Sequence, residues 1–183
     1  MKIAIWAAIV VSLLLNAAIF GFFYAWVCST MWGLDVADPR VAIQAMQAMN
    51  ASVRNMAFAP AFFGTPVALA ASAVLLLVQR YRASACAFGL AAMIYVCFGL
   101  LLTMYINVPM NEALAAVVVP DSAQAATAIW RDYSERWQLW NQVRTIASGF
   151  AFLIAVCGLL LLKRHSHQEG SKLASVSAET AVG

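Results

Sequence analysis

Four long apolar runs, separated by polar segments, set the pattern of this chain. The first three contain no charged residue, and the fourth ends at a pair of basic residues. A helix needs about 20 apolar residues to cross a bilayer core of about 30 Å. Each run therefore predicts one transmembrane helix. The runs cover residues 3–27, 55–79, 83–111 and 145–162.

The two longer polar segments each predict a further helical part. In residues 28–56, Asp38 is a natural N-cap and Pro39 suits the first helical position. The apolar residues that follow recur at helical spacing, which indicates an amphipathic helix that either lies over the mouth of the bundle or runs into the second transmembrane helix. In the second segment Asp121 begins a capping box. No proline interrupts the chain after it, so we expect one long helix over residues 122–162, with its first half outside the membrane.

Two features of the apolar runs concern helix packing. Pro60 and Pro66 remove backbone donors and predict a kink in the second helix. Within a membrane, the carbonyls that they free are tolerated only where protein or a cavity satisfies them. Small residues recur every fourth position in the first and fourth runs, which lets helices approach closely. We interpret them as packing seams inside one bundle, with a homo-oligomer interface as the alternative. They are Ala17, Gly21 and Ala25, and Ala147, Ala151 and Ala155.

The composition agrees with a membrane protein of all-α class. The 183 residues are 64% hydrophobic and 10% charged, with a mean hydropathy of +0.82, whereas soluble domains carry about 25% charged residues. We expect a single four-helix transmembrane domain over residues 1–164 and a disordered cytoplasmic tail over residues 165–183. The first run is too long for the apolar region of a signal peptide, and no cleavage site follows it, so we expect it to be retained.

The basic residues predict the orientation. Lys2, Arg80, Arg82 and the pair at 163–164 fall on one side, in the tight turn and near the termini. The five arginines of the two longer segments are balanced by six acidic residues. Both termini should therefore be cytoplasmic, with the longer segments facing outward from a bacterial inner (plasma) membrane. The net charge of +3 reflects this topology and indicates no nucleic-acid partner.

Polar and aromatic side chains gather where the last two runs meet the outer face. Asn107-Val-Pro-Met-Asn111 ends the third run, and the segment 137–144 precedes the fourth. In an antiparallel hairpin the two clusters would meet. Such groups at a membrane edge are costly and rarely accidental. The candidate catalytic residues are Arg144, Asn141, Asn107 and Asn111, and the candidate substrate-binding residues are Trp137, Trp140, Tyr105 and Tyr133.

This set of side chains suits a lipophilic aromatic or lipid-like ligand that bears an anionic or carbonyl oxygen. Arg144 offers a permanent charge and a planar fork of donors. The aromatic rings offer flat surfaces, and asparagines donate to an enolate or phenolate, which a dry site favours strongly. The only histidines, His165 and His167, lie in the tail, so the interior has no histidine ligand for haem, copper, zinc or iron. We predict no metal and no cofactor.

Each group also has a structural interpretation. Trp137 and Trp140 would form an interfacial aromatic belt. Arg144 would pair with Glu112 or Glu135. Asn107 and Asn111 would cap the helices that end and begin beside them.

The two motifs, Asn107-Val-Pro-Met-Asn111 and Trp137-x-x-Trp140-Asn141-x-Val-Arg144, resemble the anthrone-oxygenase-like family of small four-span membrane proteins over about residues 5–162. The resemblance implies a four-helix fold and the oxidation of anthrones to anthraquinones without metal or flavin, although many bacterial members have no assigned function. Many relatives have a histidine where this chain has Gln142. If that histidine is their base, this chain requires a more acidic substrate, or its activity is different or lost.

Two functions follow as hypotheses. The first is a cofactor-independent, oxygenase-like membrane enzyme acting on a lipophilic phenolic or anthrone-type substrate. The second is a non-enzymatic binder, carrier or accessory subunit for a lipid, quinone or other hydrophobic ligand. A structural subunit of a larger complex is a third interpretation. A proton-coupled transporter is the weakest, because none of the four apolar runs contains an acidic residue.

Overall fold

The computed structural model describes residues 2–182 and the side chains of residues 3–163, and every element in that part of the chain is helical. Four helices are long and apolar enough to cross a membrane: Ile3–Asp35, Phe58–Val78, Arg82–Ala115 and Ala123–Lys163. The elements, with η for π-helical segments, are α1 Lys2–Ala25, η1 Trp26–Thr30, α2 Met31–Asp35, α3 Pro39–Ser52, α4 Phe58–Val78, α5 Arg82–Ile94, η2 Tyr95–Leu101, η3 Thr103–Asn107, α6 Val108–Ala115 and α7 Ala123–Val182. The predicted all-α, four-span integral membrane protein is confirmed.

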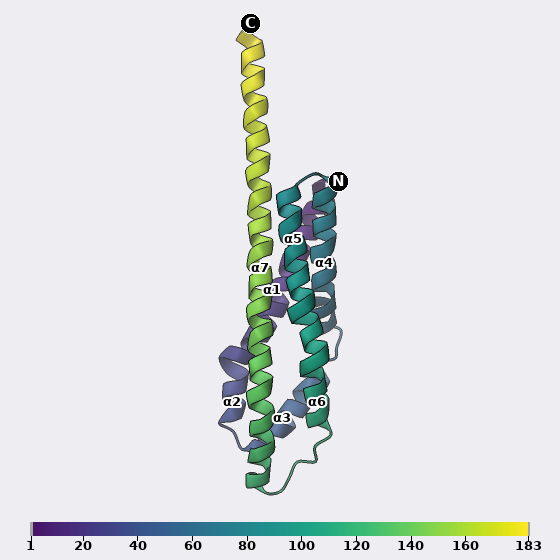
Figure 1. Ribbon diagram of the computed structural model, residues 1–183, viewed down its shortest axis with the longest axis vertical. Coiled ribbons are helices and arrows are strands. Elements are labelled where there is room, and N and C mark those ends of the chain that lie inside the picture. The colour runs from purple at the N-terminus through teal and green to yellow at the C-terminus, as the bar shows by residue number, and fades with distance from the viewer. Residues whose placement is uncertain (1, 183) are drawn as a thin grey trace.

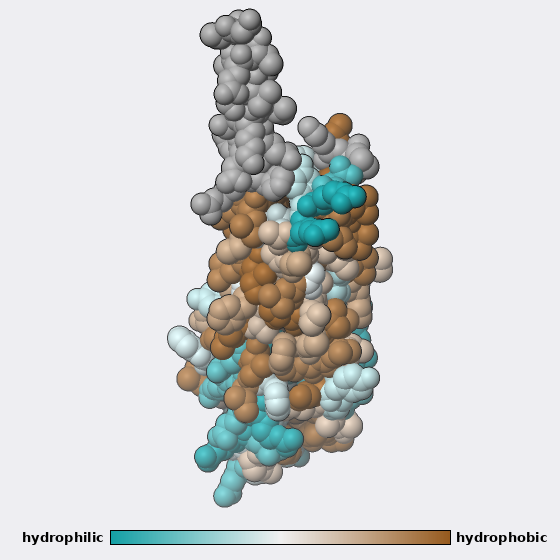
Figure 2. All heavy atoms as spheres, turned by 45° about the horizontal axis from the view of Figure 1, so that its top comes forward, coloured by the Kyte–Doolittle hydropathy of each residue, from teal (hydrophilic) through white to brown (hydrophobic). Residues whose placement is uncertain are grey.

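The spans pack as a bundle around an apolar core, and a second cluster of buried apolar residues joins η1, α2, α3 and α6 to α7. Helices α2, α3 and α6 lie at one end of it, which we call the α3 end, and α1 begins at the opposite end (Figure 1). Figure 2 shows hydrophobic side chains over the middle of one face and hydrophilic ones near its two ends. The membrane orientation and the proposed tail boundary at residue 164 stay predictions, because the side chains from Arg164 onward lie outside the described part.

The first span is longer than predicted. The helix continues past residue 27 through η1 to Asp35, because no proline or cap occurs before the Asp38-Pro39 pair. The third span likewise runs on to Ala115, through two π-helical segments. Short π segments inside α-helices are frequent at functional sites, and here both η1 and η3 lie near the α3 end.

One of the two expected small-residue seams is wrong. In α7, Ala151 and Ala155 are fully buried in the core, so that row is an internal seam as predicted. In α1, Ala17, Gly21 and Ala25 are exposed on the outside of the bundle. Sequence spacing identifies a row of small residues but not the side of the helix that the bundle covers. The homo-oligomer interpretation therefore stays a prediction for the α1 row.

The prolines of α4 have different consequences. Pro60 falls in the first turn, and Pro66 is the proline inside the helix. Since Pro66 has no N–H, the carbonyl of Phe62 loses its helical donor. The hydroxyl of Tyr95, a fully buried residue of the third span, donates to that carbonyl at 3.0 Å. The expected need for a partner at a freed carbonyl is thus met from a neighbouring helix.

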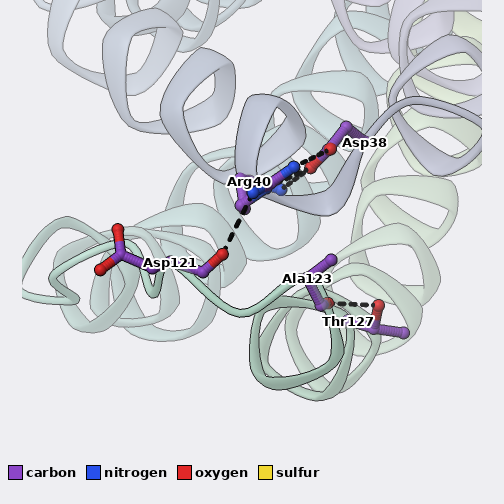
Figure 3. A network of polar contacts seen from close by, with 5 residues as sticks. All are labelled: Asp38, Arg40, Asp121, Ala123 and Thr127. Atoms are coloured by element: carbon purple, nitrogen blue, oxygen red, sulfur yellow. Dashed lines mark hydrogen bonds and ion pairs between the residues drawn. The ribbon is translucent and has the colours of Figure 1, made fainter.

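The predicted cap of α3 is confirmed. The carboxylate of Asp38 accepts from the backbone N–H of Arg40 at 2.9 Å, and from the Arg40 side chain at 3.0 and 2.6 Å. The side-chain hydrogen bond from Arg40 lowers the pKa of Asp38 to about 2. Arg40 also donates to the carbonyl of Asp121 at 3.1 Å, which links α3 to the segment before α7 (Figure 3).

The predicted cap of α7 is displaced by one residue. The N–H of Ala125 donates to the hydroxyl of Ser122 at 3.4 Å, so Ser122, and not Asp121, caps the helix. Asp121 instead offers its carbonyl to Arg40. In the first turn, the Thr127 hydroxyl donates back to the carbonyl of Ala123 at 2.8 Å (Figure 3). The expected long, uninterrupted helix from about residue 122 is confirmed.

Candidate functional site

A cavity of about 370 Å³ lies at the α3 end, between α1, α3, α4, the third span and α7. Most of its wall is aromatic or aliphatic. Ligand sites in proteins are clefts of about 300–1,000 Å³ with mainly apolar walls and a few polar groups. The polar residues of this wall are Asn50, Arg54, Thr103, Asn111, Glu112 and Arg144.

The guanidinium of Arg144 is the buried charge of this cavity, with only 5% of the residue exposed. Its Nε donates to Oδ1 of Asn141 at 2.9 Å, and its Nη1 donates to the hydroxyl of Thr103 at 3.3 Å. It also lies over two aromatic rings, 4.4 Å from the centroid of Phe23 and 5.0 Å from that of Trp137. These contacts fix the position of the group between α1, η3 and α7.

No described carboxylate pairs with Arg144. The structural interpretation that paired it with an acid is wrong, because Glu112 pairs with Arg54 at 3.4 Å and Glu135 pairs with Arg131 at 2.9 Å. An arginine has five N–H donors, and the two hydrogen bonds to Asn141 and Thr103 leave three of them for a ligand. A buried charge without a partner is costly. The free N–H donors of the guanidinium are of the kind that an anionic or strongly polar oxygen accepts from.

Asn141 holds Arg144 in place. Its Nδ2 donates to the carbonyl of Phe23 at 3.2 Å, while its Oδ1 accepts from Arg144. The side chain is buried and does not line the cavity. Asn141 thus positions the arginine and does not itself face the cavity.

Asn111 joins the two polar clusters. Its Oδ1 accepts from the Tyr133 hydroxyl at 2.8 Å and from Nε1 of Trp137 at 2.9 Å. Because the ring of Trp137 also lies beneath Arg144, the clusters meet through this tryptophan, as the hairpin predicts. Trp137 is only 2% exposed, so it is a wall of the site and not part of an interfacial belt. Asn50 donates to the Tyr133 hydroxyl at 3.4 Å.

Other predicted site residues lie outside the cavity. Asn107 is fully buried, and neither its amide nitrogen nor its oxygen has a partner among the described residues. It makes no side-chain cap either, so the capping interpretation is wrong for it. Trp140 is partly exposed and does not line the cavity. Tyr105 is 77% exposed and does not line it.

Gln142 also lies outside the cavity. It is exposed and lines a separate apolar groove between α1 and α7, with Tyr24 and Phe150 among its neighbours. A histidine at this position would face that groove and not Arg144. The departure from the resembling sequences therefore removes no base from the cavity of this chain.

Sequence reasoning missed most of the aromatic wall. Phe22, Phe23 and Trp26 come from the end of α1 and from η1, and Phe58 and Phe62 come from the start of α4. The signal was present, because aromatic residues concentrate at the end of the first apolar run and the beginning of the second. Thr103, the partner of Arg144, carried no comparable signal, since a lone threonine in a span commonly bonds its own backbone, as Thr103 also does to Gly99 at 2.6 Å.

The described residues contain no group of three or more His, Cys, Asp or Glu side chains placed to hold a metal ion. The absence of a cofactor stays a prediction.

The fold and the cavity define a class: a four-span membrane protein with an aromatic pocket and an unpaired buried arginine at one end. The family model described as anthrone oxygenase matches residues 54–154. This range covers more than half of the chain, and the protein belongs to the anthrone oxygenase family. The match includes α4, the third span and the site residues of α7, whereas the aromatic wall from α1 precedes it. No curated protein and no solved structure matches the chain.

Proposed function

We propose that the protein is a membrane oxygenase that oxidises a lipophilic phenolic or anthrone-type aromatic compound without metal or flavin. The bacterial inner membrane is its expected location, with both termini cytoplasmic and the cavity toward the outer face. The observation that carries the proposal is the unpaired guanidinium of Arg144 inside an aromatic cavity of about 370 Å³. A volume of this size suits one fused aromatic ring system.

Arg144 would act on the carbonyl oxygen of the substrate. Loss of a proton from the ring carbon opposite that carbonyl places negative charge on the oxygen, where the free N–H groups of the guanidinium stabilise it. Preorganised donors are most effective in a site that excludes water, and removal of one such donor typically costs about 10²–10³-fold in rate. The rings of Phe23 and Trp137, which already contact the guanidinium, would keep water from it.

Dioxygen would then react with the electron-rich anion. A C–O bond forms between dioxygen and the ring carbon, and a proton gives the hydroperoxide. Breaking the O–O bond, with loss of the remaining C–H proton, releases water and leaves a carbonyl. One CH₂ group and one O₂ thus give one C=O group and one H₂O, and dioxygen is the only oxidant needed.

The test is dioxygen uptake by the purified, detergent-solubilised protein with a panel of anthrones and polyphenols in metal-free buffer. Uptake should depend on the substrate and fall by at least about 10²-fold in Arg144→Gln. Arg131→Gln is the matched control, because Arg131 lies on the same helix but is exposed and paired with Glu135. Equal uptake by Arg144→Gln and Arg131→Gln would reject the proposal.

A non-enzymatic binder or carrier is the second candidate. The observation that favours it is that the buried part of the cavity offers a cation and flat surfaces but, among its described lining residues, no buried acid or base. A lipid or quinone with an anionic or carbonyl oxygen would fit the same contacts without reaction. Mass spectrometry of organic extracts distinguishes the two. A lipophile that copurifies with wild type, is missing from Arg144→Gln and leaves unchanged in air would favour binding.

A further inference from the structure

The mouth of the cavity carries one carboxylate. Of the described residues that line the cavity, only Glu112 has an acidic side chain. It forms an ion pair with Arg54 at 3.4 Å, and both side chains are largely exposed, at 61% and 64%. The cavity thus has a cation at its buried end and a carboxylate, open to water, at its mouth.

Hydrogen bonds hold the residue that precedes Glu112. Asn111, the preceding residue of α6, is held by hydrogen bonds from Tyr133 and Trp137. Thr103, which holds the guanidinium of Arg144, lies nine residues before Glu112 in the same span. At 1.5 Å per residue this places the two residues up to about 13 Å apart along the axis. Side chains that extend into the cavity shorten the gap to the scale of a fused ring system.

Because the reacting groups of an anthrone lie at opposite edges of its central ring, both ends of the cavity would be used at once. With the carbonyl oxygen at Arg144, the acidic ring carbon points toward the mouth. A carboxylate is an effective base on such a carbon when donors stabilise the resulting oxyanion. The two groups would lie on opposite sides of such a ligand, since both line the cavity and Glu112 is exposed whereas Arg144 is buried.

We propose that Glu112 is the general base of this site, an inference that rests on the proposed function. The C–H bond of the substrate breaks and its proton passes to the Glu112 carboxylate. The electron pair of that bond moves through the ring to the oxygen beside Arg144, which gives the phenolate. Since Glu112 is exposed, it returns the proton to water at the mouth and is ready for the next substrate.

Asp35 is one of several carboxylates near this end that do not line the cavity. It accepts from Trp130, Ser134 and Gln138 at 3.0, 2.7 and 2.8 Å. The alternative is that Glu112 only forms an ordinary surface ion pair with Arg54 and takes no part in the chemistry. In that case its removal would have as little effect on the chemistry as removal of Glu135, which is also an exposed glutamate paired with an arginine.

The experiment is deuterium incorporation into the ring CH₂ of anthrone, measured without dioxygen in D₂O. It isolates proton removal from oxidation. The whole protein in detergent is compared with Glu112→Gln, Glu112→Asp, Arg144→Gln and the control Glu135→Gln. Exchange above the buffer rate should fall by about 10²-fold or more in Glu112→Gln, as for loss of a general base. Glu112→Asp should keep part of it, and Glu135→Gln all of it.

The outcomes separate this proposal from the oxygenase itself. If Glu112→Gln exchanges at the wild-type rate while Arg144→Gln has lost exchange, Glu112 is not the base and the proposed function still stands. Exchange that needs Glu112 in a protein that never consumes dioxygen supports Glu112 and rejects the oxygenase. No exchange above buffer by wild type overturns Glu112 as the proton acceptor, whatever the dioxygen uptake.

Discussion

Replacement of Arg144 by methionine separates the cost of a buried charge from its use. Methionine has a similar length and no charge, and it packs favourably against aromatic rings. We expect Arg144→Met to change the free energy of unfolding by no more than about 2 kcal/mol, because the lost contacts of the arginine are offset by the relieved cost of burying its charge. Dioxygen uptake should fall by at least about 10²-fold.

The small effect on stability follows from two opposing terms. The variant loses two hydrogen bonds, to Asn141 and Thr103, and hydrogen bonds to charged groups contribute about 1.5–3 kcal/mol each. It also loses two ring contacts, each up to about 2 kcal/mol when desolvated. Against this, it no longer buries a cation without a carboxylate, which costs several kcal/mol. The losses and the gain are of the same order, and sulfur–ring contacts replace part of the loss.

The assay is unfolding in detergent followed by tryptophan fluorescence, in parallel with dioxygen uptake at a temperature where both proteins are folded. Arg131→Met, which removes an exposed arginine of the same helix, should match wild type in both measurements. A loss above about 4 kcal/mol, the size found when one partner of a buried pair is removed, would identify Arg144 as a structural anchor. Full activity in a stable Arg144→Met would refute the assignment of the oxyanion to this residue.

Three further predictions concern the supports of the site. Asn111→Ala should destabilise the protein by about 2–4 kcal/mol, because it leaves the Tyr133 hydroxyl and the Trp137 ring N–H without this acceptor. Asn111→Asp keeps the acceptor oxygen and should keep most of the stability. Thermal unfolding measures both effects. Tyr95→Phe should lower the free energy of unfolding by about 1–3 kcal/mol, because it leaves the carbonyl of Phe62 without a donor. Adding Pro66→Ala should restore most of that stability, since the new N–H re-forms the helical hydrogen bond to Phe62. A double-mutant cycle that shows no coupling between the two positions would contradict this explanation. The hydrogen bond from the Arg40 guanidinium lowers the pKa of Asp38 to about 2. The stability that the ionised cap contributes is therefore fully present above about pH 4 and is lost as the pH falls through about 2. Backbone hydrogen exchange in α3 should speed up over this pH range, and Asp38→Asn should abolish this pH dependence.

Much of the fold could be predicted because its signals are local. Run length and charge identify four spans, and Asp38 with Pro39 marks the start of α3. The errors arose where a local pattern has two outcomes. Asp121 and Ser122 are adjacent, and either can cap α7. In the structure Ser122 is the cap, and the carbonyl of Asp121 accepts from Arg40, a contact that no sequence pattern encodes. The small-residue row of α1 has the same spacing whether it faces the core or the bilayer.

The candidate site was predicted in its charged and polar members more than in its walls. Arg144, Asn111 and Trp137 were identified because polar groups are rare and costly at such a depth. The placement of Asn107 and Tyr105 was not predictable. Both lie in η3, whose π-helical geometry shifts the direction of the side chains relative to an α-helix. An α-helical count along the third span therefore assigns the wrong residues to the cavity.

Among the residues whose side chains the structure describes, the absence of an acid beside Arg144 is a consequence of how this end of the bundle distributes charge. The carboxylate of the cavity is held at the mouth by Arg54, and Asp35 is held by three neutral donors of α7. Either acid, placed beside Arg144, would neutralise it and stabilise the fold, but it would also occupy the donors that a ligand needs. Since charge interactions strengthen as water is excluded, the aromatic walls that make the bare guanidinium costly to bury also make it effective on an oxyanion. We therefore expect variants that open the wall to water, such as Phe23→Ala, to weaken the action of Arg144 on its ligand even though the arginine remains.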